Sequence, residues 1–292
     1  MIRRFAARFS LRRTLAALVL LAASPAFSAS PTLPQRPGAA VRLLVGGVVD
    51  GRPELGVEIA LEPGWKTYWR TPGDAGIPPV VDWTKSHNVA GFDLRFPAPV
   101  RFGDEGVRSI GYTDPVILPI DLTLADPAAA ATLDLDVQIG LCRDICVPVA
   151  AHLVATLSAA TPVDATALAR LAEARRRLPA AAVKGVAPWV VSLARDRESD
   201  AVGGAVLVEV KMPEDDTDAA ARDVLVEGPS ADWALPLPEK VRSAPSREYW
   251  RFDLDGVPRG ATLRGSELRF TMRIRDRIVE QRVTVDATVA EP

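Results

Sequence analysis

Apolar residues alternate with polar ones in many short stretches of this chain, and that period of two limits what it can fold into. In the clearest stretch, four aliphatic residues alternate with three polar ones: Leu133, Leu135, Val137 and Ile139 with Asp134, Asp136 and Gln138. Successive side chains of a strand point to opposite faces, so this pattern is typical of antiparallel strands with one buried face. The chain is therefore predicted to be all-β.

The alternating stretches fall into two groups, which predict two β-sandwich domains. The first domain, residues 41–158, holds the stretches 41–49, 55–61, 91–96, 116–124, 133–139 and 153–157. The second domain, residues 184–290, holds the stretches 205–210, 224–226, 249–254, 268–274 and 278–285. Each group has about the length that one hydrophobic core usually needs.

A segment of different character joins the two groups. Four apolar residues recur there at helical spacing: Leu168, Leu171, Ala174 and Leu178. Thr161 is expected to cap the helix, Pro162 to occupy its first position, and Pro179 to end it. A single amphipathic linker helix is therefore predicted over residues 161–179.

Residues 1–28 resemble a secretory signal peptide. Five arginines and no acidic residue precede or flank an apolar run over residues 15–23, and Ala26 and Ser28 supply the small residues that a signal peptidase reads. A membrane anchor would need about 18 or more apolar residues, and this run is about half that length. We expect cleavage near Ser28 and a periplasmic protein without stable membrane insertion.

The charge of the exported chain argues against a nucleic-acid partner. Without the five arginines of the leader, 30 basic residues face 37 acidic ones, which leaves a net charge near −7. A negative field of that size repels phosphate backbones. Hydrolase chemistry is also unsupported, because the two histidines and the serines lie in no recognisable nucleophile context.

The only two cysteines, Cys142 and Cys146, lie close together between two predicted strands. Residues four apart are about 13 Å distant in an extended strand but about 6 Å apart across one helical turn. The segment must therefore form a turn or a short helical loop if the two sulfurs are to pair. Disulfides persist in an exported protein, so a bond between them is predicted.

Three roles are open for this pair. A structural staple is one, although so short a ring stabilises the fold by only about 2 kcal/mol in the chain-entropy model. Thiol:disulfide exchange is favoured, because both sulfurs would stay near the surface and one could resolve a mixed disulfide formed by the other. The third role is Cu(I) binding by Cys142, Cys146 and His152, since soft thiolates suit that ion.

Three ordered motifs resemble a known family. Residues 61–79 (LEPGWKTYWRTPGDAGIPP), residues 110–112 (IGY) and residues 142–148 (CRDICVP) are similar to the periplasmic N-terminal domain of the thiol:disulfide interchange reductase DsbD. The likeness is greatest to the suppressor-of-copper-sensitivity branch of that family. It covers residues 41–158 and implies an immunoglobulin-like sandwich, so the predicted fold is two such sandwiches joined by a short helix.

The resemblance also implies roles for individual residues. Cys142 and Cys146 correspond to the redox pair, and Tyr68 and Trp69 to aromatic residues near it. A loop that shields the disulfide in the family corresponds here to residues 102–106, with Phe102, Asp104 and Glu105 as cap candidates. By residue pattern alone, the aromatic residues would be core and the acids solvated.

The implied activity is that of a thiol:disulfide oxidoreductase without a cofactor. Its partners would be a thioredoxin-like or transmembrane reductase and other exported thiol proteins. The second domain contains no cysteine and no histidine, so a scaffold or docking role is expected there. Arg273, Arg275 and Arg277 alternate with apolar residues and are predicted to line a solvated strand face.

Overall fold

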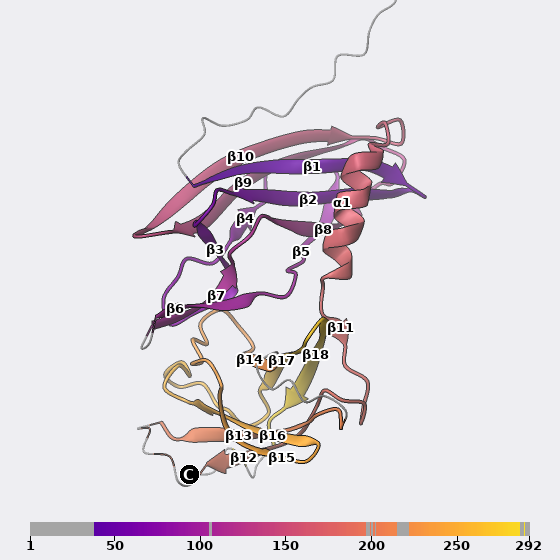
Figure 1. Cartoon of the computed structure of the whole chain (residues 1–292). Helices are drawn as coiled ribbons and strands as arrows, with labels where there is room; N and C mark the ends of the chain where they lie inside the picture. Colours follow the sequence, from indigo (N-terminus) through magenta and orange to yellow (C-terminus); the bar gives the residue numbers. More distant parts are fainter. Residues whose placement is uncertain are drawn as a thin grey trace, which may run out of the picture.

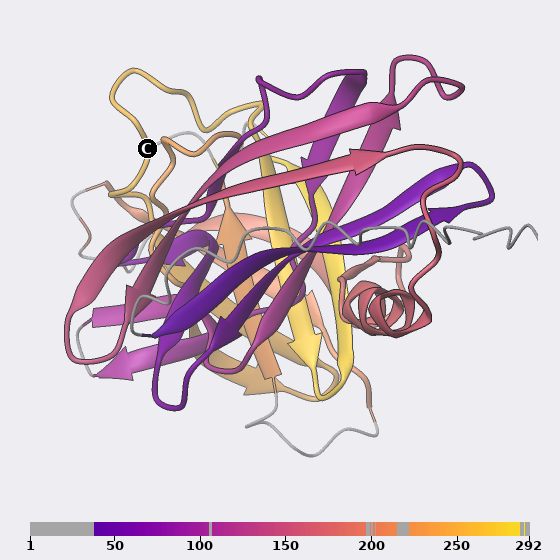
Figure 2. The same ribbon diagram turned by 90° about the horizontal axis from the view of Figure 1, so that it is seen from above.

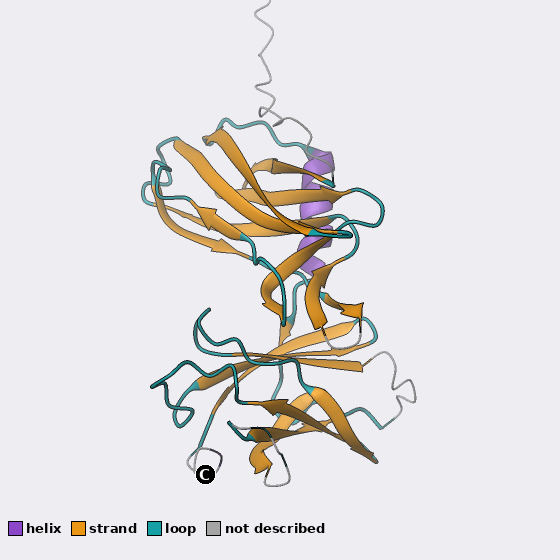
Figure 3. Ribbon diagram, turned by 90° about the vertical axis from the view of Figure 1, so that its left-hand side faces the viewer, coloured by secondary structure: helices purple, strands orange, loops and turns teal. Residues whose placement is uncertain are grey.

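The protein is built of two stacked β-sandwiches with one helix beside the upper one (Figure 1). The computed structural model describes residues 38–104, 107–196, 199, 201, 203–214, 222–286 and 289. The predicted signal peptide and the cap candidate Glu105 lie outside the described residues. The all-β fold predicted from the alternating pattern is confirmed (Figure 3).

The first sandwich contains ten strands in two sheets. One sheet has the order β1-β2-β8-β5, and the other has the order β10-β9-β3-β7-β6 with β4 paired to β9. The strands are β1 (Ala39–Val49), β2 (Arg52–Leu61), β3 (Lys66–Gly73), β4 (Val80–Asp82), β5 (Val89–Leu94), β6 (Val100–Asp104), β7 (Val107–Tyr112), β8 (Val116–Leu124), β9 (Ala131–Cys142) and β10 (Cys146–Leu157).

The alternating side chains of β9 explain how this sandwich forms. Leu133, Leu135, Val137 and Ile139 are almost fully buried in one core with strands of the facing sheet, whereas the polar residues that alternate with them are more exposed. Burying aliphatic side chains of this size stabilises the fold by roughly 1.5–3 kcal/mol each. One buried face per sheet is therefore enough to hold the two layers together.

The second sandwich has two four-stranded sheets, with orders β11-β18-β17-β14 and β12-β13-β16-β15. Its core contains aromatic pairs such as Phe252 and Phe270, whose ring centroids are 6.4 Å apart. The strands are β11 (Ala180–Ala181), β12 (Trp189–Asp196), β13 (Ala205–Lys211), β14 (Arg222–Glu227), β15 (Glu239–Ala244), β16 (Arg247–Asp253), β17 (Glu267–Ile274) and β18 (Arg277–Thr284).

Helix α1 (Ala165–Arg176) lies along the first sandwich, and Figure 2 shows it end-on beside that domain. Its N-cap is Asp164, whose carboxylate accepts from the backbone of Thr166 and Ala167, so the prediction of Thr161 as the cap was wrong. A carboxylate three residues later satisfies the free N–H groups of the first turn equally well. In the described residues no helix is long and apolar enough to cross a membrane.

Ion pairs and apolar contacts join the two sandwiches. Arg70 of β3 binds Glu227 through two hydrogen bonds of 2.8 and 2.7 Å and also binds Glu280 at 2.8 Å. Leu225 and Leu237 of the second half join the core of the first sandwich. Bidentate guanidinium–carboxylate pairs of this kind fix geometry as well as adding energy, so β3 is held by both domains.

One arginine predicted to be solvated lies instead at this junction. Arg275 and Arg277 are exposed, as expected, but Arg273 is half-buried and donates a hydrogen bond to the backbone carbonyl of Pro99. The prediction was wrong for Arg273 because the first sandwich covers that part of β17. Strand alternation shows which residues share a face, but a neighbouring domain decides whether that face meets water.

Candidate functional site

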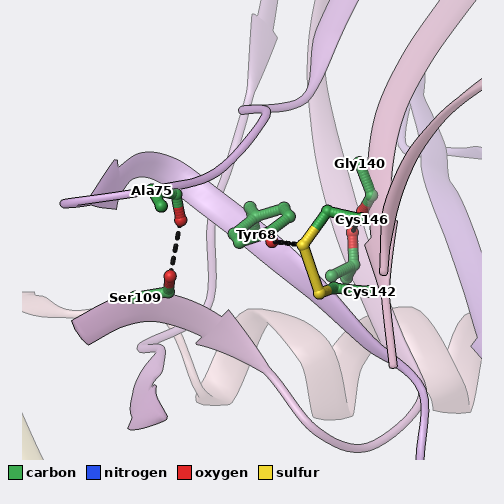
Figure 4. Close-up of a disulfide and its surroundings, with 7 residues drawn as sticks. Tyr68, Ala75, Ser109, Gly140, Cys142 and Cys146 are labelled. Carbon is green, nitrogen blue, oxygen red and sulfur yellow. Dashed lines mark hydrogen bonds between the residues drawn. A yellow bond between two sulfur atoms is a disulfide. The ribbon is translucent and has the colours of Figure 1, made fainter. Parts of the chain in front are cut away.

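The two cysteines close the hairpin between β9 and β10. Cys142 is the last residue of β9 and pairs with Cys146, the first residue of β10. Their Cα atoms are 4.1 Å apart and the sulfurs form a disulfide (Figure 4). The predicted turn and the predicted bond are thus both present.

The disulfide lies at a solvent-accessible edge of the molecule. Cys146 is exposed and Cys142 is half-buried. Ile145, between them in the loop, is 71% exposed and is the most exposed of the large apolar side chains in the described residues. The loop that carries the disulfide therefore faces solvent, with an exposed apolar side chain between the two cysteines.

Tyr68 of β3 contacts the disulfide directly. Its hydroxyl oxygen is 2.9 Å from Sγ of Cys146, and because a disulfide sulfur carries no proton, the hydroxyl is the donor. Burial raises the pKa of Tyr68 above its usual value, so the group remains protonated at neutral pH. Figure 4 shows the ring directed from β3 toward the sulfurs.

Two glycines make room for the Tyr68 ring on the outer face of its sheet. A Cβ atom on Gly76 would lie 2.5 Å from the ring, and one on Gly140 would lie 2.7 Å from it. Both distances are shorter than real contacts of a Cβ atom, so any side chain at either position must displace the tyrosine. The segment that contains Gly76 is held by the 2.5 Å hydrogen bond from Ser109 to the Ala75 carbonyl.

The hairpin of β6 and β7 borders the site through Phe102. The ring of Phe102 lies 5.9 Å from the ring of Tyr68, centroid to centroid. The ammonium group of Lys66, whose backbone pairs with Cys142, lies 5.3 Å from the Phe102 centroid. Of the acidic cap candidates, Asp104 is the last residue of β6, and Glu105 lies outside the described part of the chain.

Trp69 does not belong to this site. It is fully buried in the core of the first sandwich, on the face of β3 opposite to Tyr68, with the guanidinium of Arg70 4.2 Å from its ring centroid. Neighbouring residues of a strand cannot both face the same side. Of the two adjacent aromatic candidates, only Tyr68 reaches the disulfide.

His152 is separated from the cysteines, contrary to the copper hypothesis. It lies six residues beyond Cys146 on the same strand, about 20 Å away at the rise of a β-strand. Its Nδ1 atom is instead 2.9 Å from a carboxylate oxygen of Asp136. No group of three His, Cys, Asp or Glu side chains among the described residues is arranged to hold a metal ion.

The sequence offered no role for Gly76, Gly140 or Lys66, which the structure brings to the site. Gly140 stands inside an otherwise regular strand pattern, a position that commonly marks close approach of another group. That signal was present but did not identify the partner. Only the pairing of β3 with β9 shows that the approaching group is Tyr68.

Comparison with known proteins agrees with this geometry. Residues 36–158 match the family model described as thiol:disulfide interchange protein DsbD, N-terminal. This part of the chain is similar to DsbD N-terminal domains. The cysteine hairpin, Tyr68 and Phe102 all lie within the matched DsbD-type residues.

A solved structure shares the fold of both halves. The N-terminal periplasmic domain of ScsB from Proteus mirabilis aligns over 88% of this chain and 97% of its own length, with a TM-score of 0.68 and 20% sequence identity. The second sandwich is therefore part of an arrangement that the ScsB domain also has. No curated protein sequence is significantly similar to the chain.

Proposed function

We propose that this chain is a periplasmic thiol:disulfide exchange module, in which Cys142 and Cys146 carry a pair of electrons between protein partners. The observation that carries the proposal is the solvent-accessible disulfide with a protonated tyrosine hydroxyl on one sulfur. The match of residues 36–158 to the DsbD N-terminal family model supports the same function. The predicted signal peptide supports the periplasmic location.

In the proposed reaction, Cys146 is the sulfur that exchanges with the partner. A thiolate of a reduced, thioredoxin-like partner attacks Sγ of Cys146, which is more exposed than Cys142. The bond between Cys142 and Cys146 breaks, a mixed disulfide forms, and Cys142 leaves as a thiolate. The second thiol of the partner then displaces Cys146, so this chain ends with two thiols and the partner with a disulfide.

Tyr68 is proposed to assist both directions of this exchange. When Cys146 is released as a thiolate, the Tyr68 hydroxyl can donate to the sulfur charge, and such charge-assisted hydrogen bonds are stronger than neutral ones. The reduced protein would use the same thiolate to attack the disulfide of an exported substrate protein. Cys142 would then resolve the mixed disulfide.

The acidic residues of the β6–β7 hairpin remain part of the proposal as a cap. Phe102 touches Tyr68 from this hairpin, and Asp104 follows two residues later at the strand end. We propose that Phe102, with Asp104 and Glu105, limits access of small thiols to the sulfurs. A protein partner would have to displace this cap or approach from the Ile145 side.

The decisive experiment measures the reduction potential and traps the mixed disulfide. An exchange-active bond should have a potential above about −300 mV, and a Cys142→Ser protein should form a mixed disulfide through Cys146 with a thioredoxin-like protein. A Cys146→Ser protein should form much less. A potential well below that level, with no mixed disulfide from either variant, would show that the bond is a structural staple.

A further inference from the structure

Lys66 of β3 pairs directly with Cys142 of β9, at the end of the sheet that carries the cysteine hairpin. Residues that pair directly across two antiparallel strands point to the same face of the sheet, with Cβ atoms about 4.5–5.5 Å apart. Tyr68, two residues further along β3, shares that face and contacts Cys146 there. Lys66 therefore lies on the same side of the sheet as both sulfurs.

The side chain of Lys66 is directed toward the site. Its ammonium group lies 5.3 Å from the ring centroid of Phe102, and that ring lies 5.9 Å from the ring of Tyr68. Lys66 is half-buried, so solvent ions screen its charge less than that of a fully exposed lysine.

Arg143, the other basic residue next to the cysteines, already has a charged partner. It binds Asp144 at 3.0 Å, so the two opposite charges largely cancel at the sulfurs. Among the described side chains, no carboxylate lies within 4.0 Å of the Lys66 ammonium group. In the described part of the chain, the charge of Lys66 is thus not used in an ion pair.

The elements around Lys66 supply few other titratable groups. Glu62, in the turn before β3, and Asp74, directly after β3, each accept a hydrogen bond from a backbone N–H. Asp104 is the last residue of β6, in the neighbouring hairpin. Of these charged residues, only Lys66 pairs with Cys142 across the strands.

We propose that the charge of Lys66 stabilises the thiolate that Cys142 becomes when a partner attacks Cys146. The inference rests on the proposed exchange function and adds to it a residue that acts on the second sulfur. In this step the partner's thiolate bonds to Sγ of Cys146, the bond between the two cysteines breaks, and its electron pair leaves on Cys142. Lys66 keeps its protons throughout.

A nearby positive charge favours the leaving step. It stabilises a thiolate relative to its thiol and so lowers the pKa of the Cys142 thiol, and a thiol of lower pKa leaves faster. Tyr68 and Lys66 would then act on different sulfurs. The exchanging sulfur of Cys146 has a hydrogen-bond donor, and the leaving sulfur of Cys142 has a cation across the strand pair.

The pH profile of Cys142 alkylation tests this charge. In a Cys146→Ser background, with uncharged iodoacetamide as the probe, Lys66→Met should raise the midpoint of the profile by about 0.5 or more. That shift corresponds to roughly threefold slower alkylation at neutral pH. Lys66→Arg keeps the charge and should restore most of the profile. The shift should also shrink in about 1 M salt. The same midpoint for Lys66→Met and the native residue would overturn the inference.

Two controls separate the local charge from other effects. Lys85→Met should leave the profile unchanged, because Lys85 is 61% exposed and binds Asp136 further along β9. Equal shifts for Lys85→Met and Lys66→Met would overturn the inference, since the profile would then report only the net charge of the protein. The shift caused by Lys66→Met should persist in a Phe102→Ala background. Its loss there would show that Lys66 acts by holding the Phe102 ring and not through its charge.

Reduction of the intact disulfide separates this inference from the proposed function. With reduced thioredoxin as the probe, the full exported chain should be reduced about twofold or more faster than its Lys66→Met variant. A native chain that thioredoxin does not reduce would overturn the proposed function, and this inference with it. Equal reduction rates for the native chain and Lys66→Met would leave the exchange function standing and overturn only the role of Lys66.

Discussion

The hydroxyl of Tyr68 lies 2.9 Å from the sulfur of Cys146, although the two residues are 78 positions apart in the chain. The contact exists because β3 pairs with β9 next to the cysteine hairpin. It gives the Cys146 sulfur, proposed above to exchange with the partner, a hydrogen-bond donor. This relationship is the basis of the first two predictions.

Removing the hydroxyl alone should slow exchange. In Tyr68→Phe the ring still fills the space beside Gly76 and Gly140, but a Cys146 thiolate loses its hydrogen-bond donor. A hydrogen bond to a charged group contributes about 1.5–3 kcal/mol. We expect alkylation of Cys146 at neutral pH, measured in a Cys142→Ser background, to fall about tenfold. Tyr112→Phe is the matched control, because its buried hydroxyl donates to the Pro97 carbonyl and not to a sulfur. Equal rates for the two variants would contradict the role of Tyr68.

Adding a side chain at Gly140 should displace the Tyr68 ring. In Gly140→Ala the added Cβ would lie 2.7 Å from Tyr68, and overpacking of this kind costs about 1–3 kcal/mol. Urea unfolding should show that loss, and the small-thiol reduction rate of the disulfide should change with it. Gly91→Ala is the control, since its Cβ would meet Thr123 at an ordinary 3.4 Å. A Gly140→Ala protein as stable as the control would show that the space beside the Tyr68 ring can accept a methyl group.

Removing the Phe102 ring should expose the disulfide. We expect Phe102→Ala to accelerate reduction by a small thiol several-fold, with less effect on stability than a core substitution, because Phe102 is only half-buried. The control is Phe92→Ala, which removes another half-buried ring, one that stacks on Trp83. If both variants are reduced at the native rate, Phe102 is no cap.

The junction of the domains should depend on Glu227. Glu227→Gln removes the charge that holds Arg70 and Thr71, so the nearly buried Arg70 keeps only Glu280 as a charged partner. Breaking such a pair should cost about 2–3 kcal/mol in urea unfolding. Glu267→Gln, at an exposed pair with Arg282, should cost less than about 1 kcal/mol. Similar losses of unfolding free energy for the two variants would mean that Glu227 stabilises the domain junction no more than an exposed ion pair does.

Acid should loosen the docking of α1 through Glu58. Burial alone would raise the pKa of Glu58, but hydrogen bonds and charges from Arg170 and Arg42 outweigh it and lower the pKa. A lowered pKa stabilises the fold fully above the usual glutamate value, about 4.3, and that contribution is lost as the pH falls toward the folded-state value. Glu58→Gln should therefore be less stable than the native protein at neutral pH and nearly equal to it in strong acid. An unchanged difference across this range would contradict the assignment.

The sequence by itself determined the alternating strands such as β9, the helical link and the cysteine turn, but not strands such as β4, β12 and β15. The alternation of β9 and the helical spacing of Leu168, Leu171 and Ala174 are local patterns, because burial of one face repeats with the geometry of each element. The spacing of Cys142 and Cys146 likewise left a turn or a short helical loop as the way to join them in a disulfide. These features need no knowledge of which strands become neighbours.

Tertiary structure alone decided which residues surround the disulfide. Tyr68 and Trp69 are adjacent and equally aromatic, yet one contacts Cys146 and the other fills the core. Their roles depend on the register between β3 and β9, where a shift by one residue would exchange them. The distance from His152 to the cysteines and the burial of Arg273 beneath the first sandwich follow from the same long-range pairing. No local pattern contains that information, because strand pairing and domain docking join residues that are far apart in the chain.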